Sequence, residues 1–445
     1  MSLVLSSVGP ASALTYSSSG GKLIVPTADT CPTVTDAPRA VEVWLNTTDS
    51  ETRGWWDPKN NDPWDFSIKM GQLVCGAAPN ASIRVGMYFV RSIGTATRKE
   101  SDPDAIFDAL VYLHTKKNAN VEMVLENFQH TGVDRERIMT KWSQIGTVRF
   151  CRNGCLNYNK ESVYYAIEHE KYITISDTNY PGETSGVHPM LISSSGNLAR
   201  SQIRNYWQEA VAVYDDKELN RQFVLRHDAL WSCGATSSPK AEGCKTKTTA
   251  IAAAALKSEH KIWYDPIQRH ATDSGRGTFV SFSPQKYSVT NFYITEFNRT
   301  DCTVDKRVRV AMFKLTGTRA LDMAKALSAL VKRGCQVEVL LSSDGGSHVV
   351  DKAALKILKA AKITTRCSMI AMHTKLVMIG PMVGDDGIVM AGSVNMSLAA
   401  MRRNDEHVLT FDTRRADGAY KEDLRRAYAQ YAAGFDELNR NNEAC

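Results

Sequence analysis

The sequence lacks several features that would identify it at once. It has no low-complexity region and no run approaching the roughly 18 apolar residues that a membrane-spanning helix needs. It also lacks the G-x-x-x-x-G-K-S/T phosphate loop, the G-x-S-x-G turn of esterases and the H-E-x-x-H helix of zinc proteases. These absences disfavour the commonest nucleotide hydrolases, esterases and metalloproteases.

The composition is that of an ordinary globular protein. The 445 residues are 43% hydrophobic and 23% charged, and this length suggests two or three domains. The formal charge of +6 favours anionic partners such as phosphates, nucleic acid or acidic lipid surfaces. This preference is weak, because the excess is small and spread along the chain.

Ten cysteines are present, but no C-x-x-C pair occurs and no histidine follows a cysteine at the spacing of zinc ligands. We therefore expect disulfide bonds rather than a structural zinc site, as in proteins of oxidising compartments. Three pairs lie near each other in sequence: Cys151 with Cys155, Cys233 with Cys244, and Cys335 with Cys367.

The N-terminal residues also fit export from the cell. The stretch VLSSVGPASA ends in Ala11-Ser12-Ala13, the small-x-small pattern that precedes signal-peptide cleavage. We expect residues 1–13 to be an added start followed by a signal-peptide remnant. The predicted localisation is secreted, outside the cell.

A repeat organises the rest of the chain. Each copy has a buried-type strand, a helix with apolar residues at three- and four-residue intervals, and a second strand. The first strands are IRVGMYFV (83–90) and VRVAMFKL (308–315), the helices begin at Pro103 and Thr318, and the second strands begin at Asn120 and Gln336.

Strands separated by helices of this length imply parallel βαβ units. The sequence therefore predicts an α/β protein with two similar lobes, each a mixed sheet flanked by helices, related by a pseudo-twofold axis. We expect lobes at 14–230 and 276–445, with a connecting segment at 231–275.

Each half also carries the same polar residues in the same order. A histidine and a lysine two residues apart are followed by S-x-N and then by a glutamate, twelve or eleven residues after the asparagine. The first set is His169, Lys171, Ser195, Asn197 and Glu209, and the second is His373, Lys375, Ser393, Asn395 and Glu406.

This pattern has a physical meaning. Residues i and i+2 of a strand face the same side, so the histidine and lysine of each motif would project together. A single H-x-K is more often a surface pair, but its duplication within a repeat favours function. Two copies facing each other would place two imidazoles, two ammonium groups and two amides around one anion.

The constellation resembles the phospholipase D superfamily, whose signature is H-x-K, four residues and an aspartate, followed by G-S-x-N or G-G-x-N. The resemblance extends from about Ala40 to the end of the chain, and the second copy is the closer match. The sequence departs from the signature at the aspartate position, which is Ser176 in the first copy and Gly380 in the second, and has Ser194 in place of the motif glycine.

The resemblance implies a phosphodiesterase that works through a phosphohistidine and needs no metal or other cofactor. His169 would attack phosphorus, and His373 would protonate the leaving alcohol and then activate water or an acceptor alcohol. The lysines and asparagines of both copies would hold the non-bridging oxygens, and Ser195 and Ser393 would add hydroxyl donors. Glu209 and Glu406 would each accept a hydrogen bond from a histidine and fix its tautomer.

The leading hypothesis is a secreted phospholipase D that hydrolyses, or transfers, phospholipid head groups as a monomer in peripheral contact with a membrane. A secreted, metal-independent nuclease of the same superfamily and an inactive phosphate- or lipid-binding module are the alternatives. Arginines follow both S-x-N turns, at Arg200, Arg204, Arg402 and Arg403. They would meet a lipid interface or a phosphate backbone, or else belong to helices that pack on their own lobes.

Overall fold

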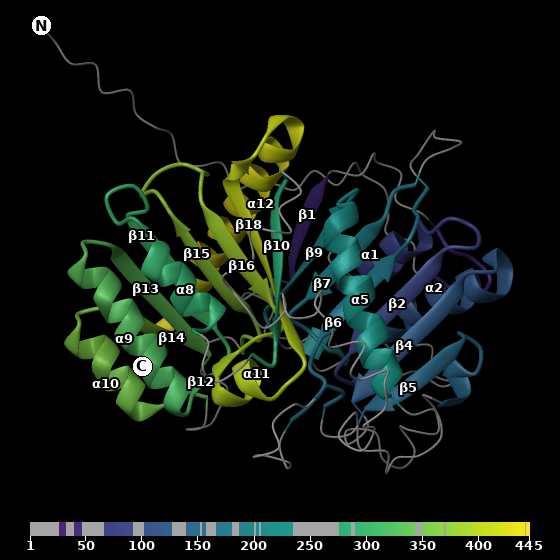
Figure 1. Cartoon of the computed structure of the whole chain (residues 1–445), viewed down its shortest axis with the longest axis horizontal. Helices are drawn as coiled ribbons and strands as arrows, with labels where there is room; N and C mark the ends of the chain where they lie inside the picture. Colours follow the sequence, from purple (N-terminus) through teal and green to yellow (C-terminus); the bar gives the residue numbers. More distant parts are fainter. Residues whose placement is uncertain are drawn as a thin grey trace, which may run out of the picture.

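The computed structural model describes residues 26–32, 40–46, 66–91, 102–126, 139–151, 154–156, 166–179, 187–199, 202–203, 206–234, 276–285, 290–342, 349–368, 371–440 and 442–445. The predicted signal-peptide remnant and most of the predicted connecting segment lie outside these residues. The described chain forms two lobes, each built on one mixed β-sheet (Figure 1). Lobe 1 runs from the first strand to helix α5, and lobe 2 follows it.

The sheet of lobe 1 has seven strands. In spatial order they are β1 (Val41–Asn46), β9 (Gln208–Tyr214), β7 (Met190–Ser194), β6 (Lys171–Ile175), β2 (Ser82–Met87), β4 (Asn120–Glu126) and β5 (Thr147–Cys151). Strands β2, β4 and β5 are parallel to one another. From β2 through β6, β7 and β9 to β1, each strand is antiparallel to its neighbour in the sheet.

The sheet of lobe 2 repeats this order and adds one strand. Its strands are β10 (Arg276–Ser283), β18 (Glu406–Ala416), β16 (Ile388–Gly392), β15 (Lys375–Gly380), β11 (Arg307–Met312), β13 (Gln336–Ser342), β14 (Thr364–Ser368) and β19 (Asn442–Ala444). The predicted repeat strands are β2 and β11, each parallel to the following strand and antiparallel to the strand that begins at a motif lysine. The predicted fold class, two similar α/β lobes with mixed sheets, is confirmed.

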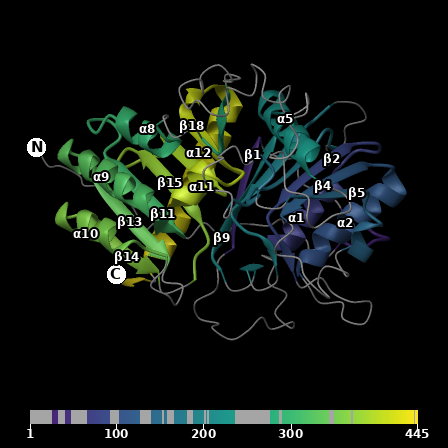
Figure 2. The same ribbon diagram turned by 60° about the horizontal axis from the view of Figure 1, so that its bottom comes forward.

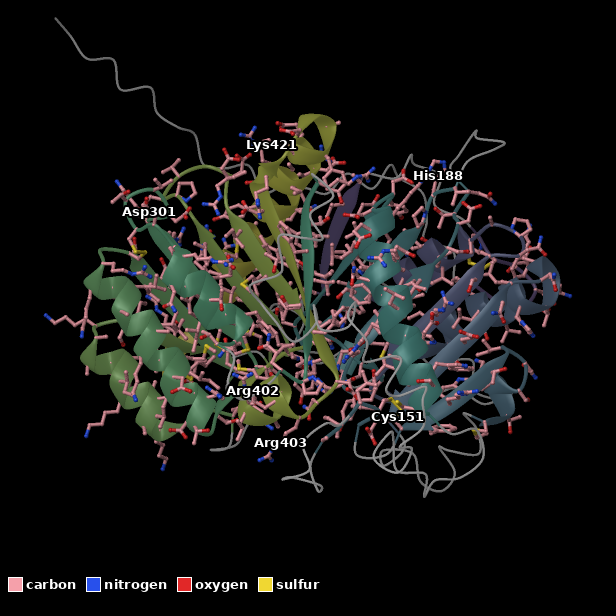
Figure 3. All side chains as sticks on the ribbon, viewed as in Figure 1. Cys151, His188, Asp301, Arg402, Arg403 and Lys421 are labelled. Carbon is pink, nitrogen blue, oxygen red and sulfur yellow. A yellow bond between two sulfur atoms is a disulfide. The ribbon has the colours of Figure 1, made fainter. Side chains whose placement is uncertain are left out.

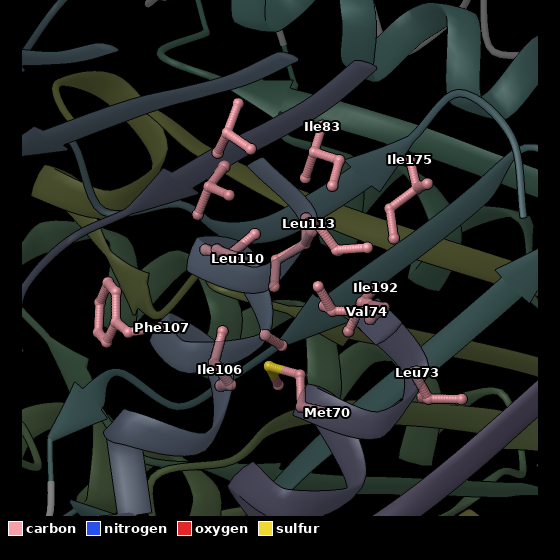
Figure 4. Close-up of a cluster of buried hydrophobic side chains, with 14 of the residues drawn as sticks. Met70, Leu73, Val74, Ile83, Ile106, Phe107, Leu110, Leu113, Ile175 and Ile192 are labelled. Carbon is pink, nitrogen blue, oxygen red and sulfur yellow. The ribbon is translucent and has the colours of Figure 1, made fainter. Parts of the chain in front are cut away.

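Helices cover the outer face of each sheet. In lobe 1 these are α1 (Phe66–Cys75) and α2 (Asp102–Lys117), and in lobe 2 they are α8 (Phe292–Arg299), α9 (Thr318–Lys332) and α10 (Lys352–Ala360). Figure 2 shows α9 and α10 at one end of the molecule and α2 at the other. In lobe 1, apolar side chains of α1 and α2 pack against Ile83, Ile175 and Ile192 of the sheet (Figure 4).

Between the sheets lies a core shared by both lobes. Helix α5 (Lys217–Cys233) follows β9, and helix α12 (Gly418–Arg440) follows β18. Each of these helices also contacts the edge strand of the other lobe, β10 for α5 and β1 for α12. One hydrophobic cluster therefore joins Tyr172 and Trp207 of lobe 1 with Phe282 and Tyr431 of lobe 2. The strands between these layers are buried on both faces, which explains their continuous apolar sequences.

Short secondary elements complete the description. The pairs β3 (Val90–Arg91) with β8 (Leu198–Ala199), and β12 (Leu315–Thr316) with β17 (Met396–Ser397), are parallel and occupy matching places in the two lobes. Helix α11 (Leu398–Arg402) follows β17. Each pair links the end of a repeat strand to the turn that carries S-x-N.

Disulfide bonds fasten both lobes, as the cysteine pattern predicts. The bonds within the described residues are Cys31–Cys75, Cys151–Cys155, Cys302–Cys335 and Cys367–Cys445. Cys335 and Cys367 lie near each other in sequence but do not pair, because β19 brings Cys445 beside β14 and Cys335 faces Cys302 instead. Cys233 is disulfide-bonded, and Cys244, its predicted partner, lies outside the described residues.

Candidate active site

The two H-x-K motifs lie where central strands begin. Lys171 is the first residue of β6 and Lys375 the first of β15, whereas His169 and His373 lie just ahead of these strands. Only the lysines are therefore strand residues, which corrects the expectation that each whole motif lies on a strand. All four residues are buried, since none of them is more than 6% exposed.

Each histidine is fixed by the opposite lobe. The backbone N–H of His169 donates to the carbonyl of Asp405 at 2.8 Å, and that of His373 donates to the carbonyl of Trp207 at 2.9 Å. Short parallel bridges run alongside these bonds, between Glu168 and Asp405 and between Met372 and Trp207. The two predicted catalytic histidines are thus brought together at the interface between the lobes.

The S-x-N turns meet the histidines at the same interface. Ser195 and Asn197 come directly after β7, and Ser393 and Asn395 come directly after β16. The Ser195 carbonyl accepts a hydrogen bond from His373 Nδ1 at 2.8 Å, so the turn of lobe 1 touches the histidine of lobe 2. Both asparagine Oδ1 atoms are buried without a partner in the part of the chain that the structure describes. Contact of the asparagines with a phosphoryl group stays a prediction.

The serine hydroxyls tie each turn to the next strand. Ser195 Oγ donates to Glu209 Oε2 at 2.9 Å and accepts from the Glu209 N–H at 3.1 Å. Ser393 Oγ accepts from the His407 N–H at 3.1 Å in the matching position. Their predicted role as donors to substrate stays a prediction. The register shows that the counterpart of Glu209 in lobe 2 is His407.

The register also shows that Glu406 of lobe 2 corresponds to Gln208 of lobe 1. Of these two residues, Glu406 contacts a motif histidine. His169 Nδ1 lies 2.9 Å from Glu406 Oε2, so a carboxylate of lobe 2 holds the histidine of lobe 1. The second carboxylate oxygen accepts from Asn404 Nδ2 at 2.9 Å. Gln208 is a buried amide whose Oε1 has no partner among the described residues.

Glu209 has a different place from the predicted one. Its carboxylate accepts from the backbone N–H of Lys375 at 3.2 Å and from the hydroxyl of Thr374, in addition to Ser195. His373 has the Ser195 carbonyl as its Nδ1 acceptor instead. The expected bond between Glu209 and His373 is therefore replaced by a bond between Glu209 and the backbone beside that histidine.

The charges around the histidines favour neutral imidazoles. Burial, followed by the nearby ammonium groups of Lys171 and Lys375, holds the pKa of both His169 and His373 well below its usual range. Burial also lowers the pKa of Lys171 to about 8 and raises that of Glu406 to about 8. A bound anion would compensate the charges of the buried lysines, so this arrangement is suited to binding one.

Two aromatic rings flank the site symmetrically. Tyr88 packs against His169 with ring centroids 4.8 Å apart, and Phe313 packs against His373 at 4.5 Å. The ammonium of Lys171 lies 5.4 Å from the Tyr88 ring, and that of Lys375 lies 5.2 Å from the Phe313 ring. The sequence analysis missed these residues, although an aromatic residue directly follows the repeat strand in both copies.

A buried ionic network supports the His169 side. Arg226 of α5 donates to Glu170 at 2.7 Å and to the carbonyl of Ser283 in lobe 2 at 2.7 Å, and lies 3.5 Å from Asp405. Asp405 accepts further hydrogen bonds from the backbone of Leu156 at the disulfide-closed loop. The residues on either side of the His169–Glu406 contact are thus held by charge-assisted bonds.

The arginines after the second S-x-N turn have different surroundings. Arg402, the last residue of α11, is fully buried, and Arg403, which follows it, is partly exposed (Figure 3). The packing alternative therefore holds for Arg402, and it has no surface to offer a lipid interface. Arg200 and Arg204 lie outside the described residues. Among the described helices, none is long and apolar enough to cross a membrane.

Comparison with known proteins agrees with this geometry. Residues 294–428 match the family model described as "Cardiolipin synthase, PLD-like domain". No curated protein matches the chain by sequence. The described fold is similar to phosphatidylserine synthase of Haemophilus influenzae, with a TM-score of 0.55, 11% identity, and coverage of 91% of this chain and 87% of the other.

Two further solved structures match less completely. A mutant of yeast tyrosyl-DNA phosphodiesterase gives a TM-score of 0.44 at 9% identity, covering 77% of this chain and 86% of the other. Nuc from Salmonella typhimurium gives 0.29 at 18% identity, covering 37% of this chain and 95% of the other. The family match shows a PLD-like domain at residues 294–428 of lobe 2, and the repeated fold and the paired H-x-K motifs extend the resemblance to the phospholipase D superfamily over both lobes.

Proposed function

We propose that this protein is a secreted phosphodiesterase of the phospholipase D type, which cleaves phospholipid head groups through a phosphohistidine. The proposal rests on one observation above all, the meeting of two buried, neutral imidazoles and two lysines at the lobe interface. The family model that matches lobe 2 is named for a lipid enzyme, which favours lipid over nucleic acid as the substrate.

His169 is the proposed nucleophile. Its Nδ1 lies against Glu406, so in the form with Glu406 ionised the proton sits on Nδ1 and the lone pair on Nε2 is free to attack phosphorus. Since the pKa of Glu406 is about 8 in the folded protein, the share of this reactive form grows as pH rises toward 8. The new bond joins Nε2 to phosphorus while the bond from phosphorus to the leaving alcohol breaks. Glu406 stabilises the positive charge that the imidazole then gains.

His373 is the proposed general acid and base. Its Nδ1 lies 2.8 Å from both the Ser195 carbonyl and Lys375 Nζ. Because neither neighbour is a carboxylate, the His373 imidazole can change between its neutral and protonated forms during the reaction. A bound phosphodiester anion opposes the field of the lysines and raises the pKa of His373, which favours the protonated acid. The imidazolium gives its proton to the leaving alcohol and then takes one from the water, or the acceptor alcohol, that cleaves the phosphorus–nitrogen bond.

Lys171, Lys375, Asn197 and Asn395 would hold the non-bridging oxygens as their charge grows. We test the reaction with bis(p-nitrophenyl) phosphate, short-chain phospholipids and supercoiled plasmid, each assayed in EDTA. Hydrolysis of the ester and of lipids in EDTA is expected. Turnover that returns only with a divalent ion would contradict the metal-free scheme, and plasmid nicking without lipid cleavage would identify a nuclease instead.

We further propose that the protein acts outside the cell as a monomer. Four disulfides within the described residues favour an oxidising compartment, and both H-x-K motifs needed for one site are present in one chain. Fractionation of the producing cells and a thiol count on native protein test the first point. Size-exclusion chromatography with light scattering tests the second, and a dimer would contradict it.

A further inference from the structure

The two half-sites differ at one partly exposed position. The residue after each flanking aromatic is Phe89 in lobe 1 and Lys314 in lobe 2. The two occupy matching places, because each lies between the end of a repeat strand and the short strand that pairs beside S-x-N. An apolar ring and a cation thus stand at equivalent points of the site.

The backbone on both sides of Lys314 is well fixed. The N–H of Phe313 donates to the carbonyl of Thr374, within the H-x-K motif, at 2.9 Å. Leu315, on the other side, pairs with Met396 directly after Asn395. The backbone of Lys314 is therefore held between the H-x-K motif and the S-x-N turn of lobe 2, and only its side chain can move.

Lys314 has no ion-pair partner among the described residues. Its charge nevertheless reaches the catalytic groups, because it contributes to the lowered pKa of His169, His373 and Lys375. The two motif lysines already suffice for the single charge of a phosphodiester. The carboxylates described at the site contact other groups, Glu406 the ring of His169 and Glu209 the backbone of Lys375, so Lys314 is available for a second negative charge on the substrate.

The position of Lys314 in the site indicates which part of the substrate it would contact. Attack by His169 is in line with the leaving oxygen, so the leaving alcohol lies toward His373. Phe313 and Tyr206 pack against His373, with centroid distances of 4.5 and 6.0 Å, and Lys314 directly follows Phe313. The His169 side has Tyr88 and Phe89 instead, with ring centroids 5.1 Å apart, and is suited to the apolar half of a lipid.

We propose that Lys314 binds a negatively charged group on the leaving alcohol, so that the preferred substrates are phospholipids with an anionic head group. This inference rests on the proposed function and on His169 being the nucleophile. It also means that a quaternary ammonium head group, such as choline, meets repulsion from Lys314 where a carboxylate or phosphate meets attraction.

Serine and ethanolamine head groups provide a matched pair, because they differ only by a carboxylate on the leaving alcohol. The experiment compares kcat/KM for dihexanoyl phosphatidylserine and dihexanoyl phosphatidylethanolamine, both below their micelle concentrations so that no charged surface contributes. The wild-type protein should prefer the serine lipid about 5- to 20-fold, as expected for one partly screened charge pair. Lys314→Gln should remove this preference, and Lys314→Glu should reverse it.

Lys332→Gln, an exposed change on α9 of the same lobe, is the matched control and should leave the ratio unchanged. Equal rates for the two lipids, or an unchanged ratio in Lys314→Gln, would overturn the proposal while leaving the proposed function intact. If the wild type cleaves neither lipid nor bis(p-nitrophenyl) phosphate, the proposed function itself fails. Cleavage of oligonucleotides alone would overturn the anionic-lipid assignment.

Discussion

The His169 half-site and the His373 half-site have the same backbone but different chemistry. An equivalent backbone hydrogen bond to the opposite lobe fixes each histidine. The imidazole of His169, however, contacts the carboxylate of Glu406, whereas that of His373 contacts the carbonyl of Ser195. Gln208 stands where a second carboxylate would complete the symmetry. A duplicated fold has thus kept its geometry, and in the proposed reaction its two halves have separate tasks, one as nucleophile and the other as proton carrier.

The largest effect should come from removing each imidazole in turn. His169→Ala should lower turnover of bis(p-nitrophenyl) phosphate by at least about 10⁴-fold, because no nucleophile remains. His373→Ala should lower it about 10²- to 10⁴-fold and show a burst of p-nitrophenol, since this good leaving group needs little acid but the phosphohistidine still needs a base.

Rapid-quench or stopped-flow measurement detects the burst, and its amplitude should approach one equivalent per chain. A burst in His169→Ala and none in His373→Ala would exchange the two roles. Retention of substantial steady-state turnover in either variant would contradict the two-histidine mechanism.

The next largest effect tests whether the carboxylate makes the difference between the half-sites. Glu406→Gln should lower kcat about 10³-fold, because the amide no longer stabilises the charge on His169. Gln208→Glu places a carboxylate at the equivalent point of the other half-site and should cost less. Both are nearly isosteric, so far-ultraviolet circular dichroism should match the wild type. Equal losses in the two variants would mean that the half-sites are not specialised in this way.

A smaller effect should arise from the ionic network around Arg226 on the His169 side. Arg226→Met leaves Glu170 buried without its partner and should lower the free energy of unfolding by about 3 to 5 kcal/mol. Urea denaturation measures this loss. Arg221→Ala, on the same helix but half exposed, is the control and should change stability far less. If the two variants are equally stable, the network does not support the interface.

The smallest effect concerns pH. Glu406 has a pKa of about 8 in the folded protein, above the ordinary value of 4.5, so between these values the folded chain holds a proton that the unfolded chain has lost. Stability should therefore fall as pH rises through this window, by at most about 1.4 kcal/mol per pH unit for this group. Urea melts from pH 5 to 8 should show a flatter dependence in Glu406→Gln.

Glu218→Gln provides the control, because the pKa of Glu218 is lowered and its stabilising charge is lost only in acid, below the window tested. This variant should keep the wild-type slope between pH 5 and 8. An unchanged slope in Glu406→Gln would show that the Glu406 carboxyl is not held protonated.

The architecture could be predicted because each strand and helix has its own local pattern of apolar residues. The repeat strands are continuous apolar runs and the helices have apolar residues at helical spacing, so each element could be recognised without its neighbours. The H-x-K and S-x-N motifs could also be recognised, since each lies at one end of a central strand, and that strand sets the position of its side chains.

The pairing of residues across the interface could not be predicted in the same way. Aligning Glu209 with Glu406 ignored a one-residue difference in spacing, and on a strand one residue is a change of face. The register of β7 with β9, and of β16 with β18, places Glu209 opposite Ser195 and His407 opposite Ser393. The disulfide connectivity could not be predicted for a related reason, since it depends on which strands become neighbours.

The contact between His169 and Glu406 also sets the order in which this protein can become active. During synthesis lobe 1 leaves the ribosome complete with its histidine and lysine, while the residue that orients that histidine lies 237 positions further along the chain. In the proposed mechanism the nascent first lobe therefore has no competent nucleophile, however well it folds. Catalytic power would appear only at the docking of the two lobes, which makes turnover a direct measure of the last step of maturation.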